Sequence, residues 1–281
     1  MAGKRIIYYS FILLFSFLSL GAKSQYYYKD IMNTVSVNRE FAIMKSAQIK
    51  TIKLKSFDDN DAPTQGFFCE KKINTNFSQS EMLSKSNITG ESVIKTDYNT
   101  QGLITKAVIT TPTTSNTIQY DYDVAGNVSK ITTATFGDYD SSIITETHEY
   151  AYSVNNKPEK MLRKKNNLLV ATINFKTDDK GNVIEENATG KSIDKKYYYY
   201  YDSQNRLTDI VHFNEIAQKL LPDFMFEYDQ ADQPKQMISV DESARNYYLW
   251  RYAYNDKNLP EIQKCYSKEK RKLGTIEYEY Q

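Results

Sequence analysis

Few residues in this sequence have the chemistry of a catalytic or metal-binding group. His148 and His212 are the only histidines, and neither stands in a recognisable metal-ligand spacing. His148 falls in a column of large apolar residues, which favours a place on a sheet face over a role as a base. Asp58, Asp59 and Asp61 are acidic enough for Ca²⁺, but the glycine and terminal glutamate of an EF-hand loop are missing. We therefore expect no catalytic residue, no cofactor and no metal site.

The two cysteines leave two interpretations open. Cys69 and Cys265 lie far apart in the sequence. A disulfide is permitted in an exported protein, provided that the Cα atoms come within about 7 Å. Two buried, inert thiols are the alternative.

Tyrosine is the most unusual component, with 24 copies beside one tryptophan. Alternation along a strand places Tyr197, Tyr199 and Tyr201 on one face, which fits a core, and Tyr198 and Tyr200 on the other. An exposed aromatic pair could stack on a sugar or contact a protein, whereas pairing with aromatic residues of neighbouring strands is the structural alternative.

We hypothesise that a ligand or partner contacts this outer face. The candidate contact residues are Tyr198, Tyr200, Tyr247, Tyr248 and Arg251, because aromatic rings beside arginine suit sugar stacking or a protein contact. The expected partner is a carbohydrate or a surface protein.

The elements that must position these residues are tandem β-hairpins. With Tyr122 as the reference, the same frame recurs at Tyr98, Tyr152, Thr177, Tyr201, Tyr228 and Tyr254, and a truncated copy closes the chain at Tyr280. Large residues stand two and four positions before each reference residue in nearly every copy. This spacing of two is typical of one face of a β-strand.

Two columns after the reference residue consist of turn-forming residues. The first holds Asn99, Asp123, Ser153, Asp178, Asp202, Asp229 and Asn255. The second holds Gly102, Gly126, Asn156, Gly181, Asn205, Asp232 and Asn258, the types that best tolerate positive φ. The spacing predicts a type I turn, then a left-handed residue with a G1 bulge, then a return strand.

Residues 120–128 (YDYDVAGNV) and 200–207 (YYDSQNRL) resemble the YD repeats of Rhs and teneurin-like proteins. The resemblance covers residues 94–281 and is closest to short, uncharacterised YD-repeat proteins of the Bacteroidota. It implies hairpins that, in long arrays, spiral into a hollow shell around a toxin or within an adhesion protein. This chain shows no Rhs core motif and no toxin domain after the repeats, and its copies look too few to close a shell.

Residues 1–24 have the layout of a secretory signal peptide. Lys4 and Arg5 precede an apolar run over residues 6–20, and small residues at Ala22 and Ser24 predict cleavage before Gln25. We expect export to the periplasm, the cell surface or the medium, with no integral membrane segment after cleavage. Loss of this segment leaves 33 basic and 35 acidic residues, a balance that does not favour a nucleic acid partner.

The predicted fold is all-β with one short N-terminal helix. Residues 25–93 form an N-terminal cap with a helix over residues 30–46 and a strand over 49–57, and residues 58–74 fit an additional, degenerate hairpin. Residues 94–281 form the repeat domain of seven copies plus a truncated eighth. The repeats are expected to build one long, twisted, mainly antiparallel sheet.

The favoured function is an exported, non-enzymatic repeat protein that serves as a surface or periplasmic binding or scaffold module. A hydrolase of envelope polymers is one alternative. An outer-membrane β-barrel is another, because aromatic strands and a signal peptide also suit one. Return strands such as those over residues 130–135 and 160–165 offer no lipid-facing band, which disfavours the barrel.

Overall fold

The structure is a computed structural model that describes residues 26–137, 143–191, 193–241 and 246–281. The predicted signal peptide, residues 1–24, lies outside the described residues. The described part contains helix α1 (Lys29–Ser46) and eighteen strands. They are β1 (Thr51–Phe57), β2 (Phe68–Ile73), β3 (Gln79–Ser86), β4 (Gly90–Tyr98), β5 (Ile104–Thr110), β6 (Thr114–Tyr122), β7 (Val128–Gly137), β8 (Ile143–Tyr152), β9 (Pro158–Lys165), β10 (Leu168–Thr177), β11 (Val183–Gly190), β12 (Ile193–Tyr201), β13 (Leu207–Asn214), β14 (Lys219–Tyr228), β15 (Pro234–Asp241), β16 (Asn246–Tyr254), β17 (Pro260–Tyr266) and β18 (Lys272–Tyr280).

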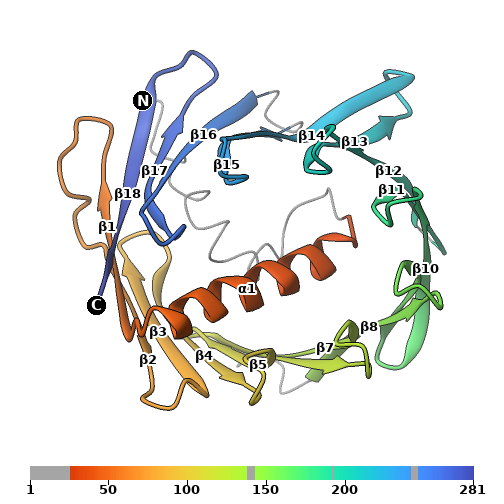
Figure 1. Ribbon diagram of the computed structural model, residues 1–281, viewed down its shortest axis with the longest axis horizontal. Coiled ribbons are helices and arrows are strands. Elements are labelled where there is room, and N and C mark those ends of the chain that lie inside the picture. Colours follow the sequence, from red (N-terminus) through yellow and green to blue (C-terminus); the bar gives the residue numbers. More distant parts are fainter. Residues whose placement is uncertain (1–25, 138–142, 192, 242–245) are drawn as a thin grey trace.

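The strands close into an antiparallel β-barrel (Figure 1). Each strand pairs with the next along the chain, from β1 with β2 to β17 with β18. The first and last strands then pair with each other, Ile52 facing Tyr280 and Phe57 facing Thr275. Among the eighteen described strands none is left at an open edge, whereas an open sheet would expose unpaired backbone groups on both sides.

The predicted long, open sheet is therefore wrong, and so is the expectation that the copies are too few to close. Strands β1, β2 and β3, from the region expected to form a cap, complete the wall together with the repeats. The structure thus has a closed barrel where an open array of YD-type hairpins was expected.

The turns follow the sequence frame closely. In the copy at Tyr122, the Asp123 N–H donates to the Asn127 carbonyl at 2.9 Å and the Gly126 N–H donates to the Asp123 carbonyl at 3.1 Å. Gly126 has φ of 86° and Gly181 has φ of 92°, and the other residues of this column also have positive φ. Strand register shifts beside the reference residue of all seven copies, so the predicted left-handed residue and bulge are confirmed.

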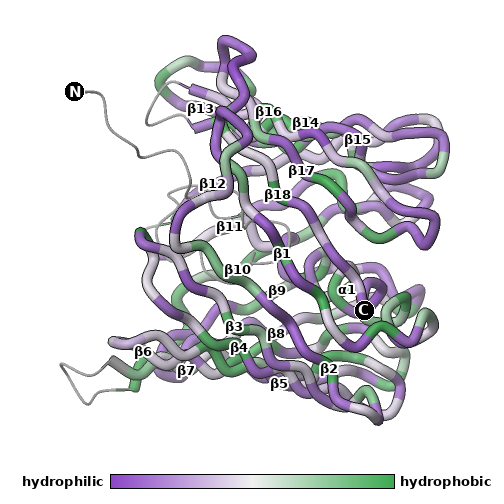
Figure 2. Tube along the Cα trace, turned by 90° about the vertical axis from the view of Figure 1, so that its left-hand side faces the viewer, coloured by the Kyte–Doolittle hydropathy of each residue, from purple (hydrophilic) through white to green (hydrophobic). Residues whose placement is uncertain are grey.

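The seven turns all lie at one end of the barrel, which we call the turn rim, together with Gln281. The connections at the other end, which we call the far rim, include residues 111–113, 166–167 and 215–218. The predicted hairpin over residues 58–74 also forms, with Asp61 at φ of 64°, but it turns at the far rim. Figure 2 shows the barrel from the side, with the turn rim and the C-terminus on the right.

Side chains alternate between an apolar inner face and a polar outer face. Tyr197 and Tyr199 point inward, and each is 2% exposed. Tyr200 of the same strand points outward and is 48% exposed. The alternation of hydrophobic and hydrophilic residues along the strands is visible in Figure 2. The predicted core column of the repeats is therefore the barrel interior.

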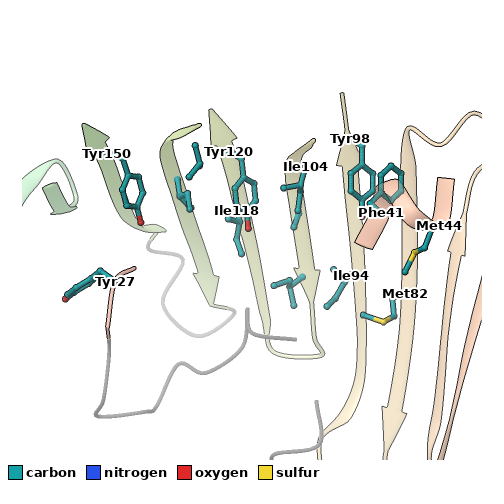
Figure 3. Packing of buried hydrophobic residues seen from close by; sticks show 14 of the residues in the cluster. Tyr27, Phe41, Met44, Met82, Ile94, Tyr98, Ile104, Ile118, Tyr120 and Tyr150 are labelled. Atoms are coloured by element: carbon teal, nitrogen blue, oxygen red, sulfur yellow. The ribbon is translucent and has the colours of Figure 1, made fainter. Parts of the chain in front are cut away.

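Helix α1 lies inside the barrel, along the wall that includes β3 to β7 (Figure 1). It begins one residue before the predicted helix and ends at the predicted residue. Phe41 stacks on Tyr98 of β4, with ring centroids 3.5 Å apart, and Met44 is fully buried near Met82 (Figure 3). A barrel of this strand number encloses more space than side chains alone can fill, so the helix supplies part of the core.

One face of α1 remains accessible inside the ring. Val35 is 61% exposed, and Arg39 and Ala42, one and two turns further on, are exposed as well. The described residues therefore do not fill the interior across this face of the helix.

Candidate functional site

A polar cluster lies inside the barrel where the chain enters α1. His148 of β8 has Nδ1 2.6 Å from Asp30 Oδ2 and Nε2 2.9 Å from Glu146 Oε1. Arg163 of β9 donates to both oxygens of Glu146, from Nε at 2.9 Å and Nη2 at 2.8 Å. The Tyr150 hydroxyl also donates to Asp30, at 2.8 Å. These contacts connect the first turn of α1 to two neighbouring strands of the wall.

Glu186 forms the second half of this cluster. Its side chain is fully buried on the inner face of β11. The backbone N–H groups of Tyr27 and Tyr28 donate to its carboxylate at 2.8–2.9 Å, and the Tyr199 hydroxyl donates at 2.9 Å. A carboxylate that accepts several hydrogen bonds can remain buried at an acceptable cost. Glu186 therefore holds the segment just before α1 against the wall.

The electrostatics of the cluster favour a positively charged His148. Burial by itself would lower the pKa of His148, but the carboxylates of Asp30 and Glu146 raise it to about 9. Burial would raise the pKa of Glu146, yet hydrogen bonds from His148 and Arg163 hold it at about 2. Burial raises the pKa of Glu186 to about 7, against the effect of the backbone N–H groups of Tyr27 and Tyr28.

This arrangement is suited to anchoring rather than to proton transfer. Both ring nitrogens of His148 are engaged by carboxylates, and the side chain is almost fully buried. A general base needs a free lone pair within reach of a substrate. No serine or cysteine contacts His148 in the hydrogen bonds found among the described residues.

The second histidine has a similar setting. His212 of β13 has Nδ1 2.8 Å from Asp223 Oδ2, and the Asp223 side chain is buried. Both histidines thus face the interior beside carboxylates.

Within the described ranges, no group of three or more His, Cys, Asp or Glu side chains could hold a metal ion.

The cysteines are free thiols. Cys69 on β2 and Cys265 on β17 are both buried, and burial raises the pKa of each thiol to about 12. Strands β18 and β1 lie between the two, so the alternative of two inert thiols describes this structure.

The predicted contact residues do not form one surface. Tyr198 and Tyr200 lie on the outer face of β12, as expected. Arg251 also points outward, with its guanidinium 5.3 Å from the ring centroid of Tyr266. Strands β12 and β16 are four positions apart, about 19 Å along the wall. Tyr248 faces inward and is 9% exposed, so its place in an exposed patch is wrong.

The interior cluster was not found from the sequence, although one signal was present. Glu146 and His148 stand six and four positions before Tyr152, in inward-facing columns of the repeat. Buried polar side chains in these otherwise apolar columns need hydrogen-bond partners, so their presence indicates a polar cluster on the inner face. Asp30 and Glu186 could not be assigned as those partners, because the contact from α1 to β8 spans more than a hundred residues.

Charged residues cover the outer wall near the closure of the barrel. Lys53 of β1 lies 3.9 Å from Glu70 of β2, which also pairs with Lys72 at 2.9 Å. Lys95 of β4 pairs with Glu81 of β3 at 3.0 Å, and Lys55 pairs with Glu279 of β18. Such exposed pairs contribute little to stability.

The described residues contain no helix with the length and apolar character that a membrane span requires.

These features define the class of the protein as a closed antiparallel β-barrel with an internal helix. No family model matches the sequence, and no curated protein matches it. Among solved structures, the chain is similar to a porin-like protein from Bacteroides uniformis, with 12% identity over 83% of this chain and 98% of that chain and a TM-score of 0.42. A porin-like protein from Bacteroides vulgatus is similar at 10% identity, with the same coverage and a TM-score of 0.30.

A third similar structure is TcdB2-TccC3, at 10% identity and a TM-score of 0.29. The match covers 76% of this chain and only 16% of that much longer one. Likenesses this distant do not assign the chain to a family, and the resemblance to YD repeats stays a prediction.

Proposed function

We propose that this chain is a non-enzymatic protein of the cell envelope, a closed barrel that works in contact with water as a scaffold or binding module. The observation that carries the proposal is the distribution of polarity across the wall. The inner face holds the aromatic core and α1, and the outer face holds ion pairs such as Lys95 with Glu81.

This polarity is the reverse of what a membrane-spanning barrel requires. Such barrels turn an apolar band about 25 Å tall toward lipid and a polar face toward the lumen. A lysine on the lipid-facing side near the bilayer midplane costs about 2–4 kcal/mol. Lys53, Lys72 and Lys95 all lie on the outer face, on β1, β2 and β4.

Two observations favour a non-enzymatic role. Both histidines lie inside the barrel against carboxylates. The two thiols are buried with raised pKa values, which disfavours the thiolate that a nucleophilic cysteine needs. Neither the histidines nor the thiols therefore support the hydrolase alternative.

An outer-membrane barrel is the second candidate, because closure is an architecture that membranes require. The two are distinguished by extraction of the native protein from envelopes with concentrated salt at neutral pH, followed by purification without detergent. Our proposal expects release into the aqueous fraction as a folded, monodisperse protein. Retention in the membrane pellet, with release only by detergent, would show that the barrel spans the bilayer.

Export is part of the proposal and rests on the residues before Gln25. The N-terminus of the native protein tests it directly. A sequence beginning at or close to Gln25 is expected, and a native protein that retains residues before Gly21 would contradict it.

A further inference from the structure

The two rims of the barrel differ in chemistry. Among the described residues, most of the large apolar side chains that are exposed lie at the far rim. They are Phe68, Ile88, Phe136, Ile143, Ile144, Leu168, Leu169, Phe213, Ile216 and Leu220. At the turn rim the corresponding side chains are Val124 and Val154 at two turn tips, with Ile184 and Tyr200 nearby.

The apolar side chains of the far rim stand at the tips of hairpins. Leu168 and Leu169 begin β10 directly after the two-residue connection from β9, and they are 72% and 59% exposed. Ile216, at 98% exposed, lies in the connection between β13 and β14, where Phe213 pairs with Leu220. Exposed apolar side chains grouped at one end of a molecule are typical of an interaction surface.

Lysines surround these tips. Lys165, Lys191, Lys196 and Lys219 are exposed at the far-rim ends of β9, β11, β12 and β14. Asp194 and Glu215 are the exposed acidic residues between Lys165 and Lys219 at this rim. The turns of the other rim are opened by aspartates such as Asp123, Asp178 and Asp202, the last of which pairs with Arg206.

We propose that the far rim seats on the surface of an anionic phospholipid bilayer, with Leu168, Leu169 and Ile216 entering the interface and the surrounding lysines meeting phosphate groups. Leucine and isoleucine tips beside lysine have the composition that interfacial membrane binding requires. Each lysine near an anionic surface adds to the attraction, and salt weakens it. The spacing from β9 to β14 spreads these contacts over about 24 Å of the rim, enough for several tips to engage at once.

This inference rests on the proposed function, since a barrel whose wall faces water can meet a bilayer only with a rim. The test uses residues 25–281 purified without detergent and co-sedimentation with vesicles. One vesicle preparation contains phosphatidylcholine alone, and the other contains equal parts of phosphatidylcholine and phosphatidylglycerol. Binding to the second preparation, weakened by added salt, is expected.

The variant Leu168→Ser/Leu169→Ser/Ile216→Ser removes the tips without touching the core. It should bind the anionic vesicles at least about tenfold more weakly, because burying one large apolar side chain contributes about that factor or more. The matched control is Val124→Ser/Val154→Ser, which removes the two fully exposed apolar side chains of the turn rim. It should bind as the parent does, and thermal melting should show both variants folded.

A second variant, Lys165→Gln/Lys191→Gln/Lys219→Gln, should lose binding to the anionic vesicles and most of its dependence on salt. No binding by the parent protein, or equal loss in the Val124 and Val154 control, would overturn the proposal. A change in oligomeric state of the Leu168 variant in the absence of vesicles would instead assign the rim to contacts between copies. A protein that needs detergent to leave the membrane would contradict the proposed function itself, which is a distinguishable result.

Discussion

The hydroxyl of Tyr254, at the end of β16, donates a hydrogen bond to the carbonyl oxygen of Pro234, at the start of β15, at 2.9 Å. The same bond joins five other reference tyrosines to the return strand of the preceding copy. They are Tyr122 with Ile104, Tyr152 with Val128, Tyr201 with Val183, Tyr228 with Leu207 and Tyr280 with Pro260. In these six copies the reference tyrosine thus connects its hairpin to the preceding one at the turn rim, beside the bulge.

Removal of one such hydroxyl should destabilise the barrel slightly. Tyr254→Phe leaves the Pro234 carbonyl without its donor, and the expected loss is about 0.5–1.5 kcal/mol in the free energy of unfolding. Urea denaturation monitored by tryptophan fluorescence measures it. The control is Tyr198→Phe on the outer face, which should change stability less. An equal loss in the free energy of unfolding for both variants would show that the hydrogen bond from the Tyr254 hydroxyl does not stabilise the barrel.

The left-handed turn residue makes a second prediction. Gly126 has φ of 86°, and a Cβ at this position would meet no atom within 4 Å. The cost of Gly126→Val therefore comes from backbone strain alone, about 1–3 kcal/mol. Gly126→Asn should cost much less, since asparagine occupies the same turn position in other copies with φ of 57–68°. An unchanged melting temperature for the valine variant would mean that the turn is assigned wrongly.

Inward and outward tyrosines of β12 should respond very differently to truncation. Tyr199 is 2% exposed and bonded to Glu186, so Tyr199→Ala should cost about 3–5 kcal/mol. Tyr200 is 48% exposed, and Tyr200→Ala should cost less than about 1 kcal/mol. The denaturation midpoints of the two variants test which side chains of β12 point into the barrel. If the outer tyrosine proved as costly as the inner one, the polarity assigned to this strand would be reversed.

Stability should fall as the pH rises from about 6.5 to 9. The pKa of His148 is 6.5 in an ordinary environment and about 9 in the folded protein, so its contribution is complete below pH 6.5 and is lost toward pH 9. The groups that face it are Asp30 of α1, Glu146 and Tyr150 of β8, Arg163 of β9 and the ring of Tyr27.

Melting temperatures of the parent and of His148→Gln at pH 7 and pH 9 provide the measurement. The parent should lose stability across this interval and the variant should lose less. The pKa of Glu186 is raised from 4.5 to about 7, so the stability that this group contributes is lost as the pH rises from 4.5 to 7, below the interval that is measured here. If the melting temperature of His148→Gln fell between pH 7 and pH 9 as much as that of the parent, groups other than His148 would be responsible for the loss.

The sequence predicts the local structure of this protein well and its closure poorly. The turn at Gly126, the bulge beside Tyr122 and the inward face of Tyr197 and Tyr199 follow from side-chain type and a period of two. The pairing of Ile52 with Tyr280 joins the two ends of the chain, and no local pattern specifies it. An open sheet and a closed one share the same repeat frame, so the frame could not decide between them.

The candidate contact residues show a different limit. Tyr248 has the same parity as Trp250 and Tyr252, which by itself places it inside. Nearness in sequence to Tyr247 and Arg251 does not place Tyr248 on their face, because side chains alternate along a strand. The anchoring of α1 through Asp30, His148 and Glu186 depends on contacts between distant segments, and the sequence shows only that His148 is a polar residue in an apolar column.

The pairing of β1 with β18 in a protein free of detergent is the most direct test of this account. Lys53 and Glu279 face each other across these strands on the outer wall. The variant Lys53→Cys/Glu279→Cys should form a disulfide on mild oxidation, while the buried Cys69 and Cys265 stay unreactive. The control Lys95→Cys/Glu279→Cys places the thiols four strands apart, about 19 Å, and should stay reduced. A fast-migrating, cross-linked monomer for the first pair alone is the predicted result, and its absence, or equal cross-linking of both pairs, would contradict the closed barrel.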